Sequence, residues 1–297
     1  MNMSIVKSIS VGNGDMFYID HNNDTLTIID CNLIEDDKIV RINELKSVAK
    51  NKTIKRFIST SPDLDHIRGL KELDKEIGIS DFYVVKNNAQ KNSENESFQK
   101  YRELHDSQNA FYISRGVSRK WLNKGDEVRN ASGIQVLWPT VNNKHFAKAL
   151  EDAEKGISPN NISPIMTYGL NGGASIIWMG DLETPFMDLI IDDIVLPQMD
   201  ILIAPHHGRH SGKVPKRFLE QIKPKVIIIG EASSDDLNYY NGYNTITQNS
   251  ARDITMDLVD KKVHFFASST SYTVEFLDDE KVTNDSLGTY LGTLNLK

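Results

Sequence analysis

The chain has 297 residues, and its 34 basic side chains (Lys and Arg) against 41 acidic ones give a formal net charge of −7. A protein that coats nucleic acid needs a basic surface to displace counterions from the phosphates, so this charge excludes that class. It leaves open an enzyme that meets an anionic substrate at one local site. Hydrophobic residues make up 39% of the chain and charged residues 25%, which is ordinary for a globular protein with a substantial core.

The sequence also indicates the cellular compartment in which the protein is expected. The longest apolar runs, such as residues 226–229 (VIII), are strand-sized and far shorter than the roughly 20 residues that a membrane-spanning helix needs. The first residues alternate like a strand and lack the apolar centre of a secretory signal. Cys31 is the one cysteine, so an internal disulfide is excluded. We therefore expect a cytoplasmic protein with no membrane partner.

In chain order, the first elements predict strands followed by a helix. Strands are expected at residues 5–11, 16–19 and 26–29, separated by turns rich in Gly, Asn and Asp. Apolar side chains at helical spacing predict a helix over 36–50. Residues 55–60 predict another strand, and a Pro-containing loop leads from it into a helix that begins near Asp65.

The middle and the end of the chain continue this alternation. Residues 87–116 are polar but keep Phe98, Tyr101 and Leu104 at helical spacing, which predicts a solvated helical insertion, either a lid or a spacer. Further strands are predicted at 134–138, 165–170, 175–179, 201–204, 226–229, 263–267 and 272–276. Further helices are predicted at about 143–154, 183–194, 214–222 and 246–260.

Strands in both halves, each half followed by helices, predict an α/β fold in which two sheets pack together with helices outside. No stretch of the sequence reads as a linker between two domains. We therefore expect residues 1–276 to form a single domain that includes the polar insertion, and residues 277–297 to form a peripheral C-terminal tail.

Candidate metal ligands gather in three short segments, and each segment directly follows a predicted strand: 61–66 (SPDLDH), 180–183 (GDLE) and 205–211 (PHHGRHS). Strand ends suit a metal site, because the rigid backbone fixes the ligands while the loops leave a coordination position open. Asp63 and Asp65 can turn to one side of an extended loop, and His66 can approach from another direction. The carboxylate of Asp181 could bridge two cations.

Each segment by itself also has a purely structural explanation. Asp65 could cap the helix that follows it, and Asp181 could lie in the first turn of the next helix, where negative charge favours the helix dipole. His206 and His207 could pack their rings in a loop without binding anything. The ordered combination of the three segments favours the metal site.

Taken in order, these and other segments resemble the motifs of the metallo-β-lactamase superfamily. Within it they are most similar to the hydrolase domain found at the C-terminus of the ComEC competence proteins and in related stand-alone proteins. The segments that carry the resemblance are VGNGD (11–15), IIDCN (28–32), STSPDLDHIRGL (59–70), WLNKGDEV (121–128), QVLWP (135–139), residues 160–183, APHHGRHSG (204–212) and KPKVIIIG (223–230). The resemblance covers most of residues 5–276 and implies an αββα sandwich of two mixed β-sheets with outer helices, the metallo-β-lactamase fold.

The resemblance also implies roles for particular residues of a metal-dependent hydrolase. The implied metal ligands are Asp63, Asp65, His66, Asp181, His206 and His207, with the choice between the two last histidines left open. Of these, Asp65, Asp181 and His207 are the implied catalytic residues. Asp30 and Ser61 would lie behind the ligands, where Asp30 orients a ligand ring by a hydrogen bond. One or two divalent cations, Zn²⁺ or Mn²⁺, would activate a water molecule.

The sequence departs from the family pattern at two places. Ser61 stands where the family usually has His, which weakens one of two metal positions. Residues 238–244 (NYYNGYN) stand where the family has a stretch containing His, so a proton donor is absent or is replaced by Tyr239, Tyr240 or Tyr243. The ligand set is rich in carboxylates, and such oxygen ligands move the preference from Zn²⁺ toward Mn²⁺ or Mg²⁺.

Arg68, Arg209 and His210 are candidate substrate-binding residues that could hold a phosphate beside the metal, and solvated surface charge is the alternative explanation. We expect a phosphodiesterase or nuclease that acts on nucleic acid or a nucleotide-like substrate. One alternative is a degenerate relative that serves as a binding or regulatory subunit with a protein partner in a larger complex, such as a defence system. Another is a hydrolase of small esters, lactones or phosphocholine esters.

Overall fold

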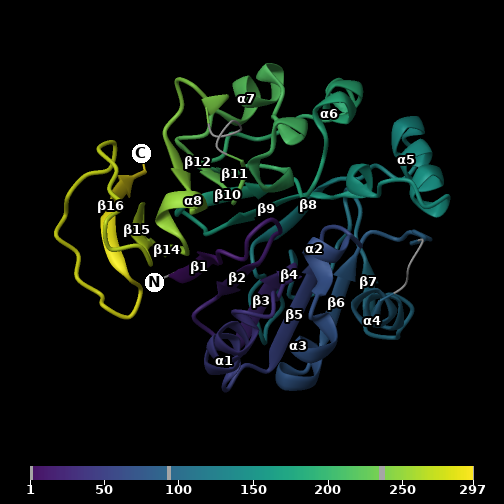
Figure 1. Cartoon of the computed structure of the whole chain (residues 1–297), viewed down its shortest axis with the longest axis horizontal. Coiled ribbons are helices and arrows are strands. Elements are labelled where there is room, and N and C mark those ends of the chain that lie inside the picture. Colours follow the sequence, from purple (N-terminus) through teal and green to yellow (C-terminus); the bar gives the residue numbers. More distant parts are fainter. Residues whose placement is uncertain (1–2, 92–94, 234–237, 297) are drawn as a thin grey trace.

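The computed structural model describes residues 3–91, 95–233 and 238–296. Within these ranges the strands form two mixed sheets, one of nine strands and one of six, which pack face to face (Figure 1). The larger sheet has the order β16 (Thr289–Asn295), β15 (Lys262–Ala267), β14 (Ile254–Val259), β1 (Ser4–Ser8), β2 (Phe17–Asp20), β3 (Thr25–Ile29), β5 (Ile54–Ser59), β6 (Asp81–Val84) and β7 (Ala110–Tyr112). The smaller sheet has the order β13 (Thr245–Thr247), β12 (Val226–Ile229), β11 (Ile201–Ile203), β10 (Ser175–Trp178), β9 (Ile165–Gly169) and β8 (Ile134–Trp138).

Helices cover the outer faces of both sheets (Figure 1). The larger sheet carries α1 (Lys38–Ala49), α2 (Leu64–Ile67), α3 (Leu70–Ile77) and α4 (Glu96–His105). The smaller sheet carries α5 (Lys144–Glu154), α6 (Thr184–Ile190) and α7 (Lys216–Ile222), and the short helix α8 (Gln248–Ala251) follows β13. A short strand, β4 (Cys31–Asn32), bridges to the end of α2. The predicted αββα sandwich of two mixed sheets is confirmed.

Strand β5 shows why the sequence folds in this way. Five of its six residues are buried, because the outer helices cover one face of the strand and the smaller sheet covers the other. Ile58 points into the core between the sheets, whereas Phe57 stacks on Phe82 of β6 in the outer core. The strand therefore forms a rigid support, and the metal-ligand segment 61–66 begins directly after it.

Two predictions near the C-terminus are wrong. Residues 246–260 do not form one helix, because Ile254, Met256 and Leu258 alternate with more polar residues and enter the core as strand β14. Residues 272–276 form no strand either. Strand β15 instead pairs with β16, which lies inside the predicted tail and forms an edge of the larger sheet.

The polar segment 87–116 contains a helix over the predicted apolar positions in the part that the structure describes. Helix α4 buries Phe98, Tyr101 and Leu104 against the outer core, where it contacts α3 and β6. Strand β7 then extends the larger sheet. The helix is therefore one of the outer helices that pack on the larger sheet. No helix in the described ranges is both long and apolar enough to cross a membrane.

Candidate metal centre

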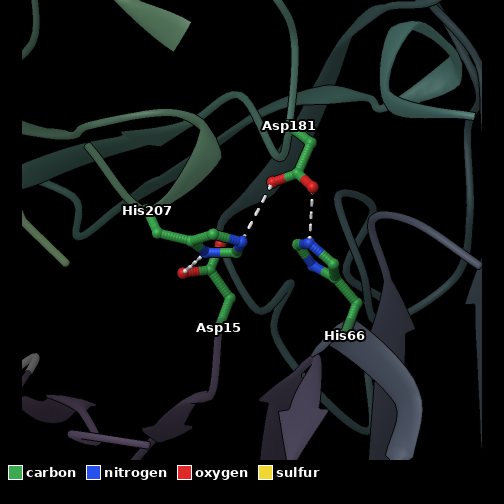
Figure 2. A group of neighbouring side chains, drawn as sticks. All are labelled: Asp15, His66, Asp181 and His207. Carbon is green, nitrogen blue, oxygen red and sulfur yellow. Dashed lines mark hydrogen bonds and ion pairs between the residues drawn. The ribbon is translucent and has the colours of Figure 1, made fainter. Parts of the chain in front are cut away.

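Four buried side chains meet where strands of both sheets end: Asp15, His66, Asp181 and His207 (Figure 2). One ring nitrogen or carboxylate oxygen from each residue lies within 4.8 Å of the others. The four residues come from the β1–β2 connection and from segments that follow β5, β10 and β11. The sandwich thus brings together four segments that are far apart in the sequence, and three of them directly follow the ends of strands.

His66 lies in α2, and both of its ring nitrogens face carboxylates. Nδ1 is 2.9 Å from Oδ2 of Asp30, and Nε2 is 2.7 Å from Oδ2 of Asp181. Asp30 is itself held by Thr60, whose backbone N–H donates to Oδ1 at 2.7 Å and whose hydroxyl donates to Oδ2. These contacts fix the imidazole with Nε2 toward the centre of the cluster.

His207 has the same arrangement on the opposite side of Asp181. Its Nδ1 is 3.0 Å from Oδ1 of Asp15, while its Nε2 is 3.4 Å from Oδ2 of Asp65 and 3.8 Å from Oδ1 of Asp181. A Cβ atom at Gly230 would lie 2.8 Å from the backbone oxygen of His207, so glycine permits the close packing of this loop on the end of β12. Each imidazole therefore has one aspartate behind it and presents Nε2 to Asp181.

Three atoms of this centre are buried without a well-aligned hydrogen bond to any described residue: Oδ1 of Asp181 and both ring nitrogens of His207. Buried polar atoms in this state are costly, and they often mark a binding role. Imidazole nitrogens and carboxylate oxygens are the ligands that Zn²⁺ and Mn²⁺ accept in proteins. The donor set therefore fits a divalent cation.

The pKa values of the cluster are set by opposing effects. Burial by itself lowers the pKa of His66, but the negative charges of Asp181 and Asp30 outweigh it and raise that pKa well above its ordinary value. Burial likewise opposes the charge on His207, yet Asp15 and Asp181 raise its pKa to about 10. Burial opposes the charge on Asp181, and the two imidazoles still lower its pKa. In the cation-free protein both imidazoles thus carry protons that balance the aspartates.

The metal-loop residues Asp65, Asp63 and Ser61 take three different positions. Asp65 lies at the solvent-facing side of the centre, with 24% of its side chain exposed and Oδ2 toward His207. Asp63 forms an ion pair with Nζ of Lys91 and is not among the four clustered residues. The buried hydroxyl of Ser61 accepts a hydrogen bond from the backbone N–H of Asp63 at 3.2 Å. Ser61 and Asp63 are therefore engaged with other groups.

Of the two neighbouring histidines, the structure places His207 in the cluster. Nδ1 of His206 is 2.9 Å from the hydroxyl of Ser211, and its Nε2 is 3.3 Å from Nη1 of Arg209. Burial lowers the pKa of His206, so this ring is neutral near pH 7. His206 therefore contacts Arg209 and Ser211 of its own loop and is not one of the four clustered side chains.

The other predicted substrate-binding residues lie on the surface. Arg68 is exposed and donates from Nε to Oδ1 of Asn32 at 2.8 Å. His210 is exposed and packs edge-on against Tyr239. The hydroxyl of Tyr239 donates to the backbone oxygens of Gly208 and Arg209, so this tyrosine anchors the histidine loop. Tyr240 is buried in the hydrophobic core, so it packs there and is not exposed to a substrate.

Asp15 is not among the site residues that the sequence predicts, although the sequence holds a signal for it. Asp15 ends the segment VGNGD, which is one of the motifs that carry the family resemblance. A Cβ atom at Gly14 would lie 2.5 Å from the backbone oxygen of Asp65, and the N–H of Asp15 donates to that same oxygen at 3.1 Å. The glycine therefore lets this loop contact the metal loop, which brings the Asp15 carboxylate next to His207.

Gly180, directly before Asp181, offers a test of how tightly this centre is packed. Its φ is +51°, and a Cβ atom would lie 2.7 Å from Cβ of Ser163 and 3.0 Å from Cβ of Thr60. We expect Gly180→Ala to lower the free energy of unfolding by about 1–3 kcal/mol more than Gly172→Ala, because overpacking adds to the backbone strain. Gly172 is the matched control, since its φ is +76° and no described atom lies within 4 Å of its Cβ position. Urea denaturation measures both losses, and equal losses would show that the packing around Gly180 yields easily.

Comparisons with known proteins give likenesses of fold alone. No protein-family model and no curated protein matches the chain. Among solved structures, the chain is similar to Igni18, a novel metallo hydrolase from the hyperthermophilic archaeon Ignicoccus hospitalis, with a TM-score of 0.46 and 14% identity over 84% of this chain and 98% of that chain. It is also similar to CmlA, a diiron beta-hydroxylase from Streptomyces venezuelae, with a TM-score of 0.45 and 9% identity over 80% of this chain and 46% of that chain. The matched region thus spans about half the length of CmlA.

Proposed function

We propose that the protein is a metal-dependent hydrolase that cleaves phosphodiester bonds in nucleic acid or a nucleotide-like substrate. The observation that carries the proposal is the position of Asp181, which lies buried between two imidazoles that are each backed by an aspartate. The order of the sequence motifs, which resembles that of ComEC-like hydrolases, supports the same chemistry. The chain's net charge of −7 does not oppose it, because bound metal would neutralise part of the excess acid at this one site.

The residues suited to hold one cation, Zn²⁺ or Mn²⁺, are His66 and His207 through Nε2, with Asp181 and Asp65 through their carboxylates. Asp15 and Asp30 lie on the Nδ1 sides of the two rings, where carboxylates orient a ligand imidazole. We propose a single ion, because Ser61 and Asp63, which the resemblance implies at a further position, are engaged elsewhere.

A bound divalent cation supplies two effects: it lowers the pKa of a water molecule and neutralises charge on a phosphoryl oxygen. The protein's own residues supply position and proton transfer. Asp65 faces solvent, and its pKa is lowered, although burial opposes this, by the imidazole of His207, whose Nε2 lies 3.4 Å from Oδ2. Its carboxylate is therefore ionised, and one oxygen would hold the cation while the other accepts a hydrogen bond from an approaching water. Arg209, held beside His206, is placed to neutralise a phosphate.

The test is a cleavage assay on protein that has been stripped of metal and then reloaded. We expect Mn²⁺ or Zn²⁺ to restore cleavage of bis(p-nitrophenyl) phosphate, DNA, RNA or cyclic nucleotides, and Asp65→Ala to remove it. Asp188→Asn is the control, because Asp188 is an exposed carboxylate on α6. Metal binding without cleavage of any phosphodiester would reject this function. A parallel panel of small esters, lactones and phosphocholine esters tests the alternative hydrolase.

A second candidate function is a binding or regulatory subunit that keeps the sandwich but has lost turnover. The ion pair between Lys91 and Asp63 favours it, because a cationic side chain there competes with a metal ion for the same carboxylate. Stripped protein that folds normally, binds no divalent cation and cleaves none of the substrates would favour this function over the hydrolase.

A further inference from the structure

A cavity with a largely apolar lining lies apart from the metal centre. It has a volume of about 530 Å³ and is lined by residues that include Val85, Ile113, Pro139, Phe146 and Leu150. Small-molecule sites in proteins are usually apolar cavities of roughly 300–1,000 Å³ with a few polar groups at the rim. None of the four clustered metal-centre residues lines this cavity.

The cavity is built where three strands end. Its walls are the segments that directly follow β6, β7 and β8, together with one face of α5. Ligands in α/β sheets commonly bind beyond the carboxyl ends of strands, because loops there can diverge over a rigid support. Strand β6 pairs in parallel with β5, whose end carries the metal loop, so the cavity and the metal centre lie at the same end of the larger sheet.

Backbone hydrogen bonds tie the walls of this cavity to one another. Ile113 N–H donates to Val84 O at 2.9 Å, and Arg115 N–H donates to Pro139 O at 2.7 Å. Gln90 N–H donates to Ala153 O at 3.0 Å, which joins the segment after β6 to α5. A cavity whose walls are fixed in this way is formed before a ligand arrives, so less ordering opposes binding.

The charged groups at the rim do not favour an ionic ligand. Nζ of Lys86 lies 5.3 Å from the ring centre of Tyr112, and the carboxylate of Glu154 accepts from Nδ2 of Asn88 at 3.4 Å. Glu151 already pairs with Lys155 and with Lys148 outside the cavity. The other two charged groups in the lining, Lys86 and Glu154, have opposite charges and add no net charge to the site. The remaining surface of the walls is largely apolar.

We propose that this cavity is a binding site for an uncharged small molecule with an aromatic or branched aliphatic body, separate from the metal centre. Such a ligand would bury its apolar surface against Phe146, Leu150 and Ile113, and burial of that kind is the main driving force in apolar sites. Val141, which is 62% exposed, adds apolar surface at the rim of the cavity.

The probe for this site is N-phenyl-1-naphthylamine, an uncharged aromatic compound whose fluorescence rises in apolar surroundings. We expect saturable binding of one equivalent to the wild-type protein. Ala147→Trp should weaken it roughly tenfold or more, because Ala147 lines the cavity from an exposed position of α5 and the indole would fill the space. Lys144→Trp is the matched control, since Lys144 is exposed on the same helix and does not line the cavity.

Two further measurements keep the test decisive. Val141→Glu places a charge at the rim and should also weaken the probe, while circular dichroism checks that each variant is folded. Asp181→Asn should leave the probe affinity unchanged, so a failure of the proposed hydrolase function does not affect this result. Absence of saturable binding, equal affinities in the two Trp variants, or a loss of binding in Asp181→Asn would each overturn the proposal.

Discussion

Asp181→Asn is expected to weaken strongly the binding of a divalent cation to the centre. Its Oδ2 lies 2.7 Å from Nε2 of His66, and its buried Oδ1 has no hydrogen-bond partner among the described residues. The amide keeps the shape of the side chain but removes the charge, so it is a much poorer ligand. We expect the affinity for Mn²⁺ and Zn²⁺ to fall at least about a hundredfold, which corresponds to about 2.8 kcal/mol. Isothermal titration calorimetry on metal-stripped protein measures this loss.

Thermal unfolding gives a second measurement of the same effect. A ligand at about 100 times its dissociation constant stabilises the folded protein by about 2.7 kcal/mol, so the wild-type protein should melt at a higher temperature with cation present. Asp181→Asn should show no such shift. The control Asp188→Asn removes one exposed carboxylate from α6 and should behave like the wild type. Wild-type affinity in Asp181→Asn would mean that any bound ion lies elsewhere.

Elements with a strong local pattern could be predicted from the sequence. Strand β8 has the predicted bounds, and α5 follows Asn143, whose side chain accepts from the N–H groups of His145 and Phe146 as an N-cap. Strand β16 could not be predicted in this way, because its pairing with β15 depends on a partner more than twenty residues away. A local pattern does not contain that information.

In the candidate site, too, local patterns could be predicted from the sequence and tertiary contacts could not. The segments containing His66, Asp181 and His207 were predicted as candidates because each follows an apolar strand, and strand ends converge in a sandwich. Asp63 could not be separated from Asp65 by spacing, since the difference is a tertiary contact with Lys91. The choice between His206 and His207 likewise depends on loop geometry: both residues have positive φ, and only one ring turns toward Asp181.

The acidity of the two imidazoles determines how cation binding depends on pH. In the cation-free protein the pKa of His207 is raised to about 10 despite burial, by Asp15 and Asp181, and the pKa of His66 is also raised well above its ordinary value. Both raised values stabilise the cation-free fold below the unfolded-state pKa, and this contribution is lost as the pH rises through the folded-state values. Protons and a cation therefore compete for the same nitrogens.

Cation affinity is accordingly expected to rise steeply between about pH 6 and pH 8, because binding must displace both protons. Each displaced proton changes the apparent dissociation constant about tenfold per pH unit, so two protons give about a hundredfold per unit. Calorimetry in buffers of different ionisation enthalpy counts the protons released.

Asp15→Asn removes the main charge that holds the proton on His207. In this variant the number of protons released on cation binding should fall toward one, and the change in cation affinity should fall toward tenfold per pH unit. Asp188→Asn should keep the wild-type slope. An affinity independent of pH over this range would mean that both rings are neutral before the cation binds, and that the aspartates behind them orient the imidazoles without protonating them.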